Sequence, residues 1–212
     1  KTTQVLFFNI GSAGLSNYTL SSNTLTPLFK PPNGVLASNE ITHTSTKLWL
    51  SDNREFPVYT WAEYDITLNP FTISFNRSLT LTGTYSTWCA ITNTTFCGTD
   101  LNSLYEMSIV GNALVTTATH ANVIDTGYYA TALNYDPILD QFVLFTQQNG
   151  NDTYIVKIFN RSPFLLVQTI PFTMGGQYDD VWGLFSANNT MYVTESNGSV
   201  WSIANSSPFT AT

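Results

Sequence analysis

Acidic side chains are the residues of this 212-residue chain that could most readily take part in a reaction. Hydrolysis of a glycosidic bond needs an acid and a second carboxylate at a set separation. Glu40 and the adjacent pair Asp179 and Asp180 are the best candidates, because they flank positions expected to begin repeating units. Most other carboxylates fall in turns, where Asp is ordinary turn chemistry; the set includes Asp52, Glu63, Asp65, Asp100, Glu106, Asp125, Asp136 and Asp140. A glycoside-processing enzyme is therefore a remote alternative, and we predict that the chain is not an enzyme.

Nucleophilic and metal chemistry finds little support. The two histidines, His43 and His120, lie in Thr-rich stretches typical of strands, and no G-x-S-x-G nucleophile elbow is present. Neither Asp179-Asp180 nor the segment from Asp136 to Asp140 resembles a full calcium-binding loop. We predict no metal site and no cofactor.

Cys89 and Cys97 are the only cysteines, in the segment WCAITNTTFC. A disulfide across a short β excursion would fit an oxidising compartment, and two free buried thiols are the alternative. A metal site is disfavoured because no His lies near them in sequence. The chain begins at Lys1 without an apolar leader, so we expect any signal peptide to have been removed. No apolar run approaches the roughly 18 residues of a membrane helix.

Eight Asn-x-Ser/Thr sequons predict N-glycosylation. They are at Asn17, Asn76, Asn93, Asn151, Asn160, Asn188, Asn197 and Asn205. Chance alone supplies several such triplets in a chain rich in Asn, Ser and Thr. Charged residues, however, make up only 10% of the chain, against roughly 25% in a typical domain. Glycans can replace charge in keeping a surface soluble, so we expect a secreted or cell-surface glycoprotein.

The charge pattern argues against nucleic acid as a partner. The net charge is −7, and the seven basic residues do not cluster into a stripe that could follow phosphates. We expect self-association or binding to other extracellular glycoproteins or glycans.

A short phrase recurs along the chain and indicates a repeat architecture. It places an aromatic or aliphatic residue two positions before an aliphatic one, ahead of a polar turn into a second extended run. The five copies are Tyr18-Thr19-Leu20, Tyr64-Asp65-Ile66, Tyr105-Glu106-Met107, Val156-Lys157-Ile158 and Trp201-Ser202-Ile203. Helical periodicity is nearly absent, and short runs rich in β-branched and aromatic residues alternate with turn residues.

The repeat predicts an all-β fold: a β-propeller of about five four-stranded antiparallel units of roughly 46 residues. We predict one domain over residues 1–212, with units at 1–32, 33–82, 83–126, 127–172 and 173–212. The unit at 127–172 is the most regular, with strands expected at 129–133, 141–146, 153–159 and 164–170. We expect the recurring aromatics to form core. The architecture and period resemble five-bladed lectin propellers of the tachylectin-2 type, although no binding motif of that family can be matched to residues here.

The predicted function is that of a secreted, N-glycosylated structural or adhesive protein, such as a subunit of an extracellular assembly or filament. A glycan-binding, lectin-like propeller is the alternative. The extended segment at residues 1–8 is a candidate for strand addition to another subunit, and an ordinary first strand in its own sheet is the competing interpretation.

Overall fold

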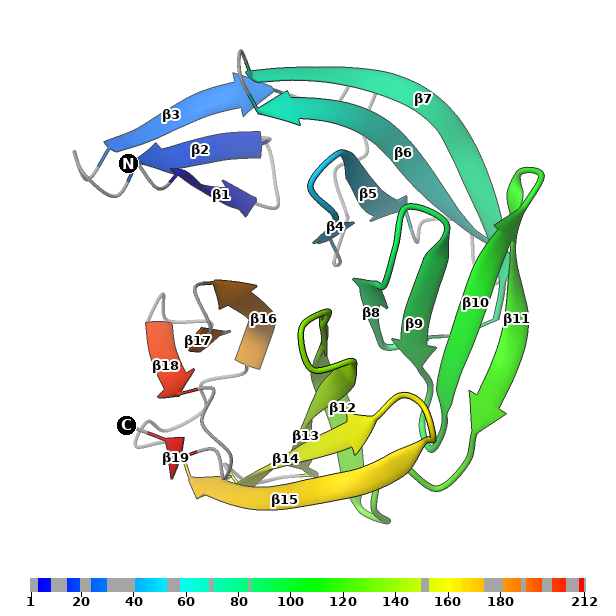
Figure 1. Ribbon diagram of the computed structural model, residues 1–212, viewed down its shortest axis with the longest axis vertical. Helices are drawn as coiled ribbons and strands as arrows, with labels where there is room; N and C mark the ends of the chain where they lie inside the picture. The colour runs from blue at the N-terminus through cyan, green and yellow to red at the C-terminus, as the bar shows by residue number, and fades with distance from the viewer. Residues whose placement is uncertain are drawn as a thin grey trace. The chain divides into compact units, whose positions relative to one another are not determined.

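The computed structural model describes the backbone of residues 4–8, 15–19, 24–29, 41–52, 58–68, 71–83, 85–149, 153–173, 181–187, 190–195, 200–204 and 210–211. Side chains are described for residues 41–50, 60–67, 72–83, 85–149 and 153–171, and for Val193. All regular structure within these ranges is β-strand (Figure 1), which confirms the all-β prediction. None of the described segments is a helix of the length and apolarity that crossing a membrane requires.

The strands form successive sheets along the chain (Figure 1). The first sheet has the order β1-β2-β3, with β1 (Gln4–Phe8), β2 (Leu15–Thr19) and β3 (Thr24–Phe29). β1 pairs with β2 along its whole length, as expected for an ordinary first strand of its own sheet.

The second sheet has eight strands in the order β4-β5-β6-β7-β11-β10-β9-β8. Its first half is β4 (Ile41–His43), β5 (Lys47–Asp52), β6 (Val58–Leu68) and β7 (Phe71–Thr82). Its second half is β8 (Thr87–Ala90), β9 (Thr95–Thr99), β10 (Leu104–Val110) and β11 (Ala113–His120). The halves join through one parallel pair, Ala113 with Thr80, so each half is a four-stranded group of its own.

Two further four-stranded antiparallel sheets complete the chain. One is β12 (Tyr128–Asp136), β13 (Gln141–Gln148), β14 (Thr153–Asn160) and β15 (Leu165–Thr173). The other is β16 (Val181–Ala187), β17 (Thr190–Glu195), β18 (Val200–Ala204) and β19 (Thr210–Ala211). The four strands predicted within residues 127–172 are found as β12 to β15.

The chain separates into two compact units: Lys1–Gly83 with Ile109–Val115, and Thr84–Ser108 with Thr116–Thr212. In the first unit, β5 and β6 carry a cluster of buried residues that includes Leu48, Leu50, Tyr64 and Ile66. The aromatic of the repeated phrase is therefore core at Tyr64, as predicted. Trp201 of the last copy lies outside the described side chains.

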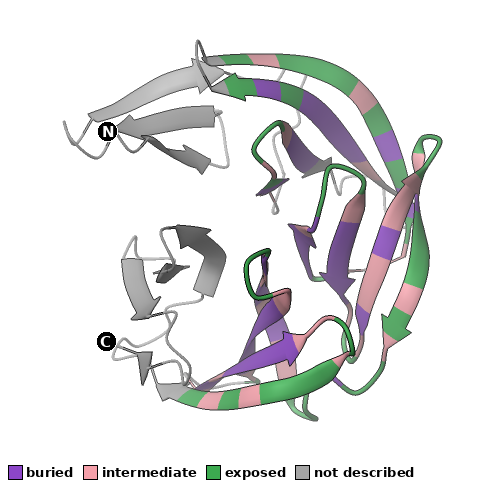
Figure 2. Ribbon diagram, viewed as in Figure 1, coloured by how far each residue is buried: buried purple, intermediate pink, exposed green. Residues whose placement is uncertain are grey.

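In the second unit, β13 is covered on both faces. Residues 142–147 are all buried (Figure 2), and side chains alternate between the faces of a strand. Phe142 and Leu144 join a cluster that contains Cys97, whereas Val143 and Phe145 join one that contains Val193 of β17. The sheet β12-β13-β14-β15 is thus sandwiched between residues of two other strand groups, which is how the blades of a propeller bury their faces.

The β8–β9 hairpin contains one close backbone approach. Trp88 lies directly opposite Gly98, and a Cβ added at Gly98 would meet the indole Cε3 of Trp88 at 2.7 Å. Only glycine leaves room for the ring there. The indole consequently stays almost fully buried over the strand that carries Cys97.

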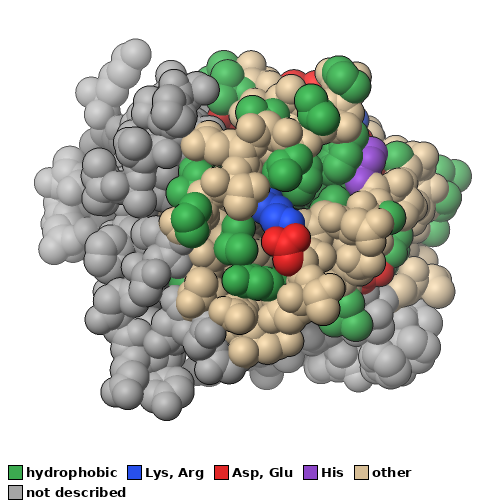
Figure 3. All heavy atoms as spheres, turned by 90° about the horizontal axis from the view of Figure 1, so that it is seen from below, with side chains coloured by type: hydrophobic (Ala, Val, Ile, Leu, Met, Phe, Trp, Pro, Cys, Tyr) green, Lys and Arg blue, Asp and Glu red, His purple; other side chains and the backbone are tan. Residues whose placement is uncertain are grey.

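Charge is scarce on the described surface. Figure 3 shows hydrophobic side chains scattered over the face seen from below, with few charged side chains among them. Several of the exposed hydrophobic residues are consecutive, at Leu165, Leu166 and Val167 at the start of β15.

Candidate functional site

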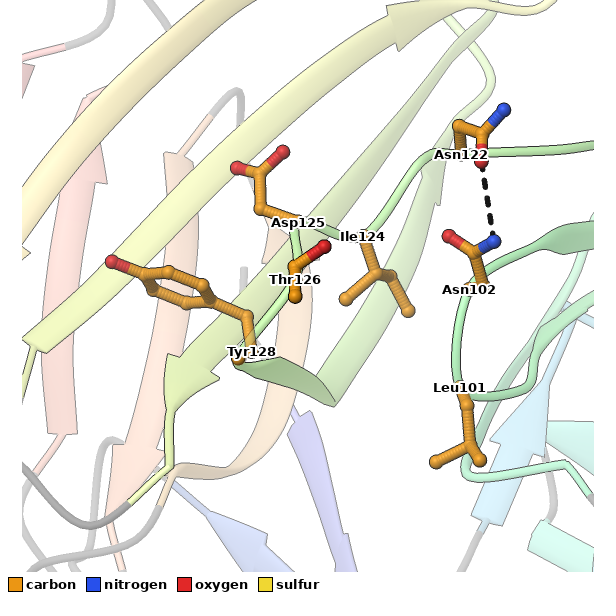
Figure 4. Close-up of a pocket in the computed structure, with 8 residues that line it drawn as sticks. Leu101, Asn102, Asn122, Ile124, Asp125, Thr126 and Tyr128 are labelled. Carbon is orange, nitrogen blue, oxygen red and sulfur yellow. Dashed lines mark hydrogen bonds between the residues drawn. The ribbon is translucent and has the colours of Figure 1, made fainter.

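A pocket of about 370 Å³ lies in the second unit, between the β9–β10 connection and the segment joining β11 to β12. Figure 4 shows Asn102 and Asn122 facing each other on one side and Asp125, Thr126 and Tyr128 along the other. These side chains supply two amides, a carboxylate, an aliphatic hydroxyl and a phenol. Such a set favours hydrogen bonding to a small polar ligand.

The β9–β10 connection forms the first wall of the pocket, and Asp100 holds it in place through hydrogen bonds. Its Oδ1 accepts hydrogen bonds from the backbone N–H groups of Asn102 and Ser103 at 2.8 and 2.7 Å, and its Oδ2 accepts one from the Tyr105 hydroxyl at 2.5 Å. Burial acts to raise the pKa of Asp100, but these hydrogen bonds outweigh it and hold the pKa below its usual value. The carboxylate stays charged and fixes the turn that presents Asn102.

The segment joining β11 to β12 forms the second wall, and it is hydrogen-bonded to the first. The N–H of Val123 donates to the Asn102 carbonyl at 3.0 Å, and Nδ2 of Asn102 donates to Oδ1 of Asn122 at 3.2 Å. Asn122 adopts a left-handed conformation with φ of 60°, which is uncommon outside glycine and is tolerated best by Asn and Asp. The two connections therefore form one braced structure.

A buried lysine holds the far end of the second wall. The Lys157 side chain is 7% exposed, and its Nζ donates to the Val123 carbonyl at 3.0 Å and lies 2.7 Å from Oδ1 of Asp125. Beyond Asp125, the N–H of Tyr128 closes a turn onto the Asp125 carbonyl, and Gly127 supplies the required positive φ of 86°.

The sequence offers Asp125 as one carboxylate among many, and it gives no signal that singles out Asn102, Asn122, Thr126 or Tyr128. Asn and Thr are common in turns, so their types alone carry no signal for a pocket. Only the tertiary placement of two connections about twenty residues apart brings them together.

His120 lies in an ion-pair cluster apart from the pocket-lining residues. Its Nε2 is 3.2 Å from Oε1 of Glu106, whose Oε2 accepts from Nε of Arg161 at 2.8 Å. The imidazole also stacks on Phe164, with ring centroids 3.7 Å apart. His120 is thus a hydrogen-bonded strand histidine, as expected, and it connects β11 to the β14–β15 turn.

Among the carboxylates of the first unit whose side chains are described, Glu63 is the most buried, with its side chain 1% exposed. It accepts hydrogen bonds from Lys47 and Trp49 at 3.0 Å, Asn76 at 2.6 Å and Arg77 at 3.3 Å. Burial acts to raise its pKa, but the hydrogen bonds from Lys47, Trp49 and Arg77 prevail and lower it. Glu63 is therefore a buried, charged strut between β5, β6 and β7.

The prediction that most carboxylates fall in turns is wrong for Glu63 and Asp65, which lie within β6, and for Glu106, which lies within β10. Asp136 behaves as ordinary turn chemistry, because its Oδ1 accepts the N–H groups of Ile138 and Leu139 at 2.8 and 3.1 Å. Glu40, Asp179 and Asp180 lie outside the described residues. Within the part of the chain that is described, no three His, Cys, Asp or Glu side chains are grouped so as to hold a metal ion.

Three of the eight sequon asparagines have described side chains. Asn93 is exposed in the β8–β9 turn. Asn76 is exposed, yet its Nδ2 donates to Glu63. Asn160 is half-buried, and its Oδ1 accepts from Gln141 at 2.9 Å. The side chains of Asn17, Asn151, Asn188, Asn197 and Asn205 lie outside the described set, and glycosylation stays a prediction at all eight.

Cys89 and Cys97 are direct cross-strand partners on β8 and β9, and both are buried thiols in this structure. Burial, followed by the hydrogen bond with Cys89, raises the pKa of the Cys97 thiol well above its ordinary value. The disulfide remains a prediction, now with the two residues placed opposite each other.

We expect the protein from its native source to contain the Cys89–Cys97 disulfide. Because the folded hairpin buries both sulfurs, the chain should be unfolded in denaturant without reductant, alkylated and mapped by peptide mass. The prediction is that neither cysteine is labelled until a reductant is added. Alkylation of both residues without reduction would show free thiols instead.

Comparisons with known proteins support the fold alone. No protein-family model matches the chain, and no curated protein matches it. A crystal structure of a protein from Lactobacillus plantarum is 16% identical over 100% of this chain, with a TM-score of 0.51. Hydrazine synthase from Kuenenia stuttgartiensis is 9% identical over 97%, with a TM-score of 0.54. Both are propeller-like, and this chain spans 66% and 61% of their respective lengths.

Proposed function

We propose that this chain is a secreted, N-glycosylated structural or adhesive protein that associates with further copies of itself. The observation that carries the proposal is the exposed aliphatic patch formed by residues 165–167, called the 165–167 patch below. Low charge and the sequons support an extracellular setting. The five strand groups support a propeller of five blades, which is part of the proposal.

The 165–167 patch consists of three consecutive aliphatic residues. Leu165, Leu166 and Val167 are 59%, 45% and 48% exposed. They begin β15, which is an edge of its sheet and carries no charged residue. Consecutive exposed aliphatic residues on an edge strand are a candidate interaction site.

The patch is better suited to side-chain contact than to extending the sheet. The register of β15 against β14 shifts beside Phe159, so that Val167 has no partner, and Pro171 lacks an N–H. Bulges and prolines both discourage pairing through a strand edge. The aliphatic side chains themselves are therefore the proposed contact.

A second copy of this chain is the occupant we propose. A two-fold contact places the same surface on both sides, and an uncharged strand can face itself without like-charge repulsion. The net charge of −7 opposes association elsewhere on the surface, so contact is favoured where charge is absent.

The substitution Leu166→Lys tests the proposed self-association directly. We expect wild-type protein to sediment as oligomers in a concentration-dependent manner and Leu166→Lys to sediment as a monomer, because two-fold contact would then bring two buried ammonium groups together. Ile138→Lys is the matched control, since Ile138 is 75% exposed and lies in a turn outside the patch. Monomeric wild-type protein, or unchanged oligomers in Leu166→Lys, would reject the proposal.

A glycan-binding, lectin-like propeller is the second candidate function. The braced polar pocket beside Asn102 and Asn122 favours it.

A further inference from the structure

We infer that the pocket between residues 100–103 and 121–127 is a binding site for a neutral saccharide. The inference gives the lectin-like candidate a specific site and does not depend on self-association. The volume of the pocket, about 370 Å³, falls within the range of small-molecule sites, roughly 300–1,000 Å³. The lining groups and their rigidity identify the class of ligand.

The polar side chains that line the pocket can form hydrogen bonds with adjacent hydroxyl groups of a saccharide. A saccharide presents several O–H groups that both donate and accept, and side-chain amides and carboxylates offer paired atoms to meet them. Within the described part of the chain, the hydroxyls of Thr126 and Tyr128 form no hydrogen bond to a protein group, so both can serve a ligand.

The site is organised before any ligand arrives. Asn102 and Asn122 bond to each other on one side of the pocket at 3.2 Å, and Asp125 is held by the almost fully buried Lys157. Groups held in place by their neighbours lose little entropy on binding.

Charge favours a neutral sugar. Lys157 already pairs with Asp125 at 2.7 Å and is 7% exposed, so its ammonium is turned to the protein. An acidic saccharide would meet the 51% exposed Asp125 carboxylate on a chain of net charge −7. Sialylated or sulfated sugars should therefore bind more weakly than their neutral counterparts.

The test uses protein produced without N-glycans, exposed to a panel of immobilised neutral mono- and disaccharides with their sialylated and sulfated forms. Asn122→Gly removes the amide while keeping a backbone that glycine accepts without strain. Tyr128→Phe removes only a hydroxyl. Thr119→Ala is the control, at an exposed position of β11.

We expect at least one neutral saccharide to bind the wild-type protein. Each pocket variant should weaken binding about tenfold, the effect of losing one hydrogen bond to the ligand, and Thr119→Ala should bind normally. The inference is overturned if no neutral sugar binds, or if both pocket variants bind as tightly as the wild type.

The saccharide could come from the chain's own N-glycans or from an external source. Repeating the panel with glycosylated protein distinguishes the two. If the chain's own N-glycans fill the pocket, binding is weaker until they are removed enzymatically, whereas an external source predicts equal binding before and after removal. Failure of self-association is distinguishable from failure of this inference, because the pocket variants leave the 165–167 patch intact.

Discussion

Replacing Glu63 with alanine is expected to lower the free energy of unfolding by about 3 kcal/mol. Breaking a buried ion pair from one side typically costs about 3–5 kcal/mol, because the partner charges remain. The lower end applies here since Lys47 keeps Asp65 at 2.6 Å and Arg77 keeps the Gly111 carbonyl at 2.9 Å. Denaturant unfolding of wild type and Glu63→Ala measures the difference.

Asp65→Asn is the matched control for Glu63, because it removes a carboxylate from the same lysine at a half-exposed position. Its effect should stay within about 1 kcal/mol. An equal loss in both variants would contradict the burial argument.

The same carboxylate gives the stability a dependence on pH. The pKa of Glu63 is lower in the folded chain than its ordinary value of about 4.3. The stabilisation is therefore present above about pH 4.3 and is lost as the pH falls through the folded value. Glu63→Gln should flatten this acid limb of the stability profile.

Truncation of Phe145 to alanine is expected to lower the free energy of unfolding by about 3–5 kcal/mol, the usual cost of deleting a fully buried aromatic ring. Phe145, on β13, is 0% exposed and belongs to a cluster with buried residues of β12 and β14 and Val193 of β17. The cavity would lie where one strand group packs against the next. Thermal unfolding should therefore also begin at a lower temperature.

Phe75→Ala provides the comparison for Phe145. Phe75 is 56% exposed and makes an edge-to-face contact with Tyr64, with ring centroids 5.7 Å apart. Its loss should cost at most about 1 kcal/mol. Comparable costs at the two positions would mean that Phe145 is not central to the core.

The repeated phrase predicted much of the fold because it marks equivalent strands. Its copies at Tyr64, Tyr105, Val156 and Trp201 lie in β6, β10, β14 and β18, the third strand of each four-stranded group. Period-two burial and polar turns are local properties, so the sequence carries them directly. The strand groups and the all-β class could therefore be expected without a structure.

The sites could not be predicted in the same way. Glu63 looked like one carboxylate among many, and its role depends on donors that converge from β5 and β7. Its only sequence signal is a Glu placed within a strand between Trp61 and Tyr64, both of which are buried. The pocket likewise needs Asn102 and Asn122 to meet through tertiary hydrogen bonds.

Negative-stain electron microscopy of the native, glycan-bearing protein tests the central proposal most directly. A structural or adhesive protein that associates through the 165–167 patch predicts filaments or regular arrays, and it predicts that Leu166→Lys yields only separate particles. Discrete single particles of the wild-type protein at high concentration would contradict the proposed role in an assembly.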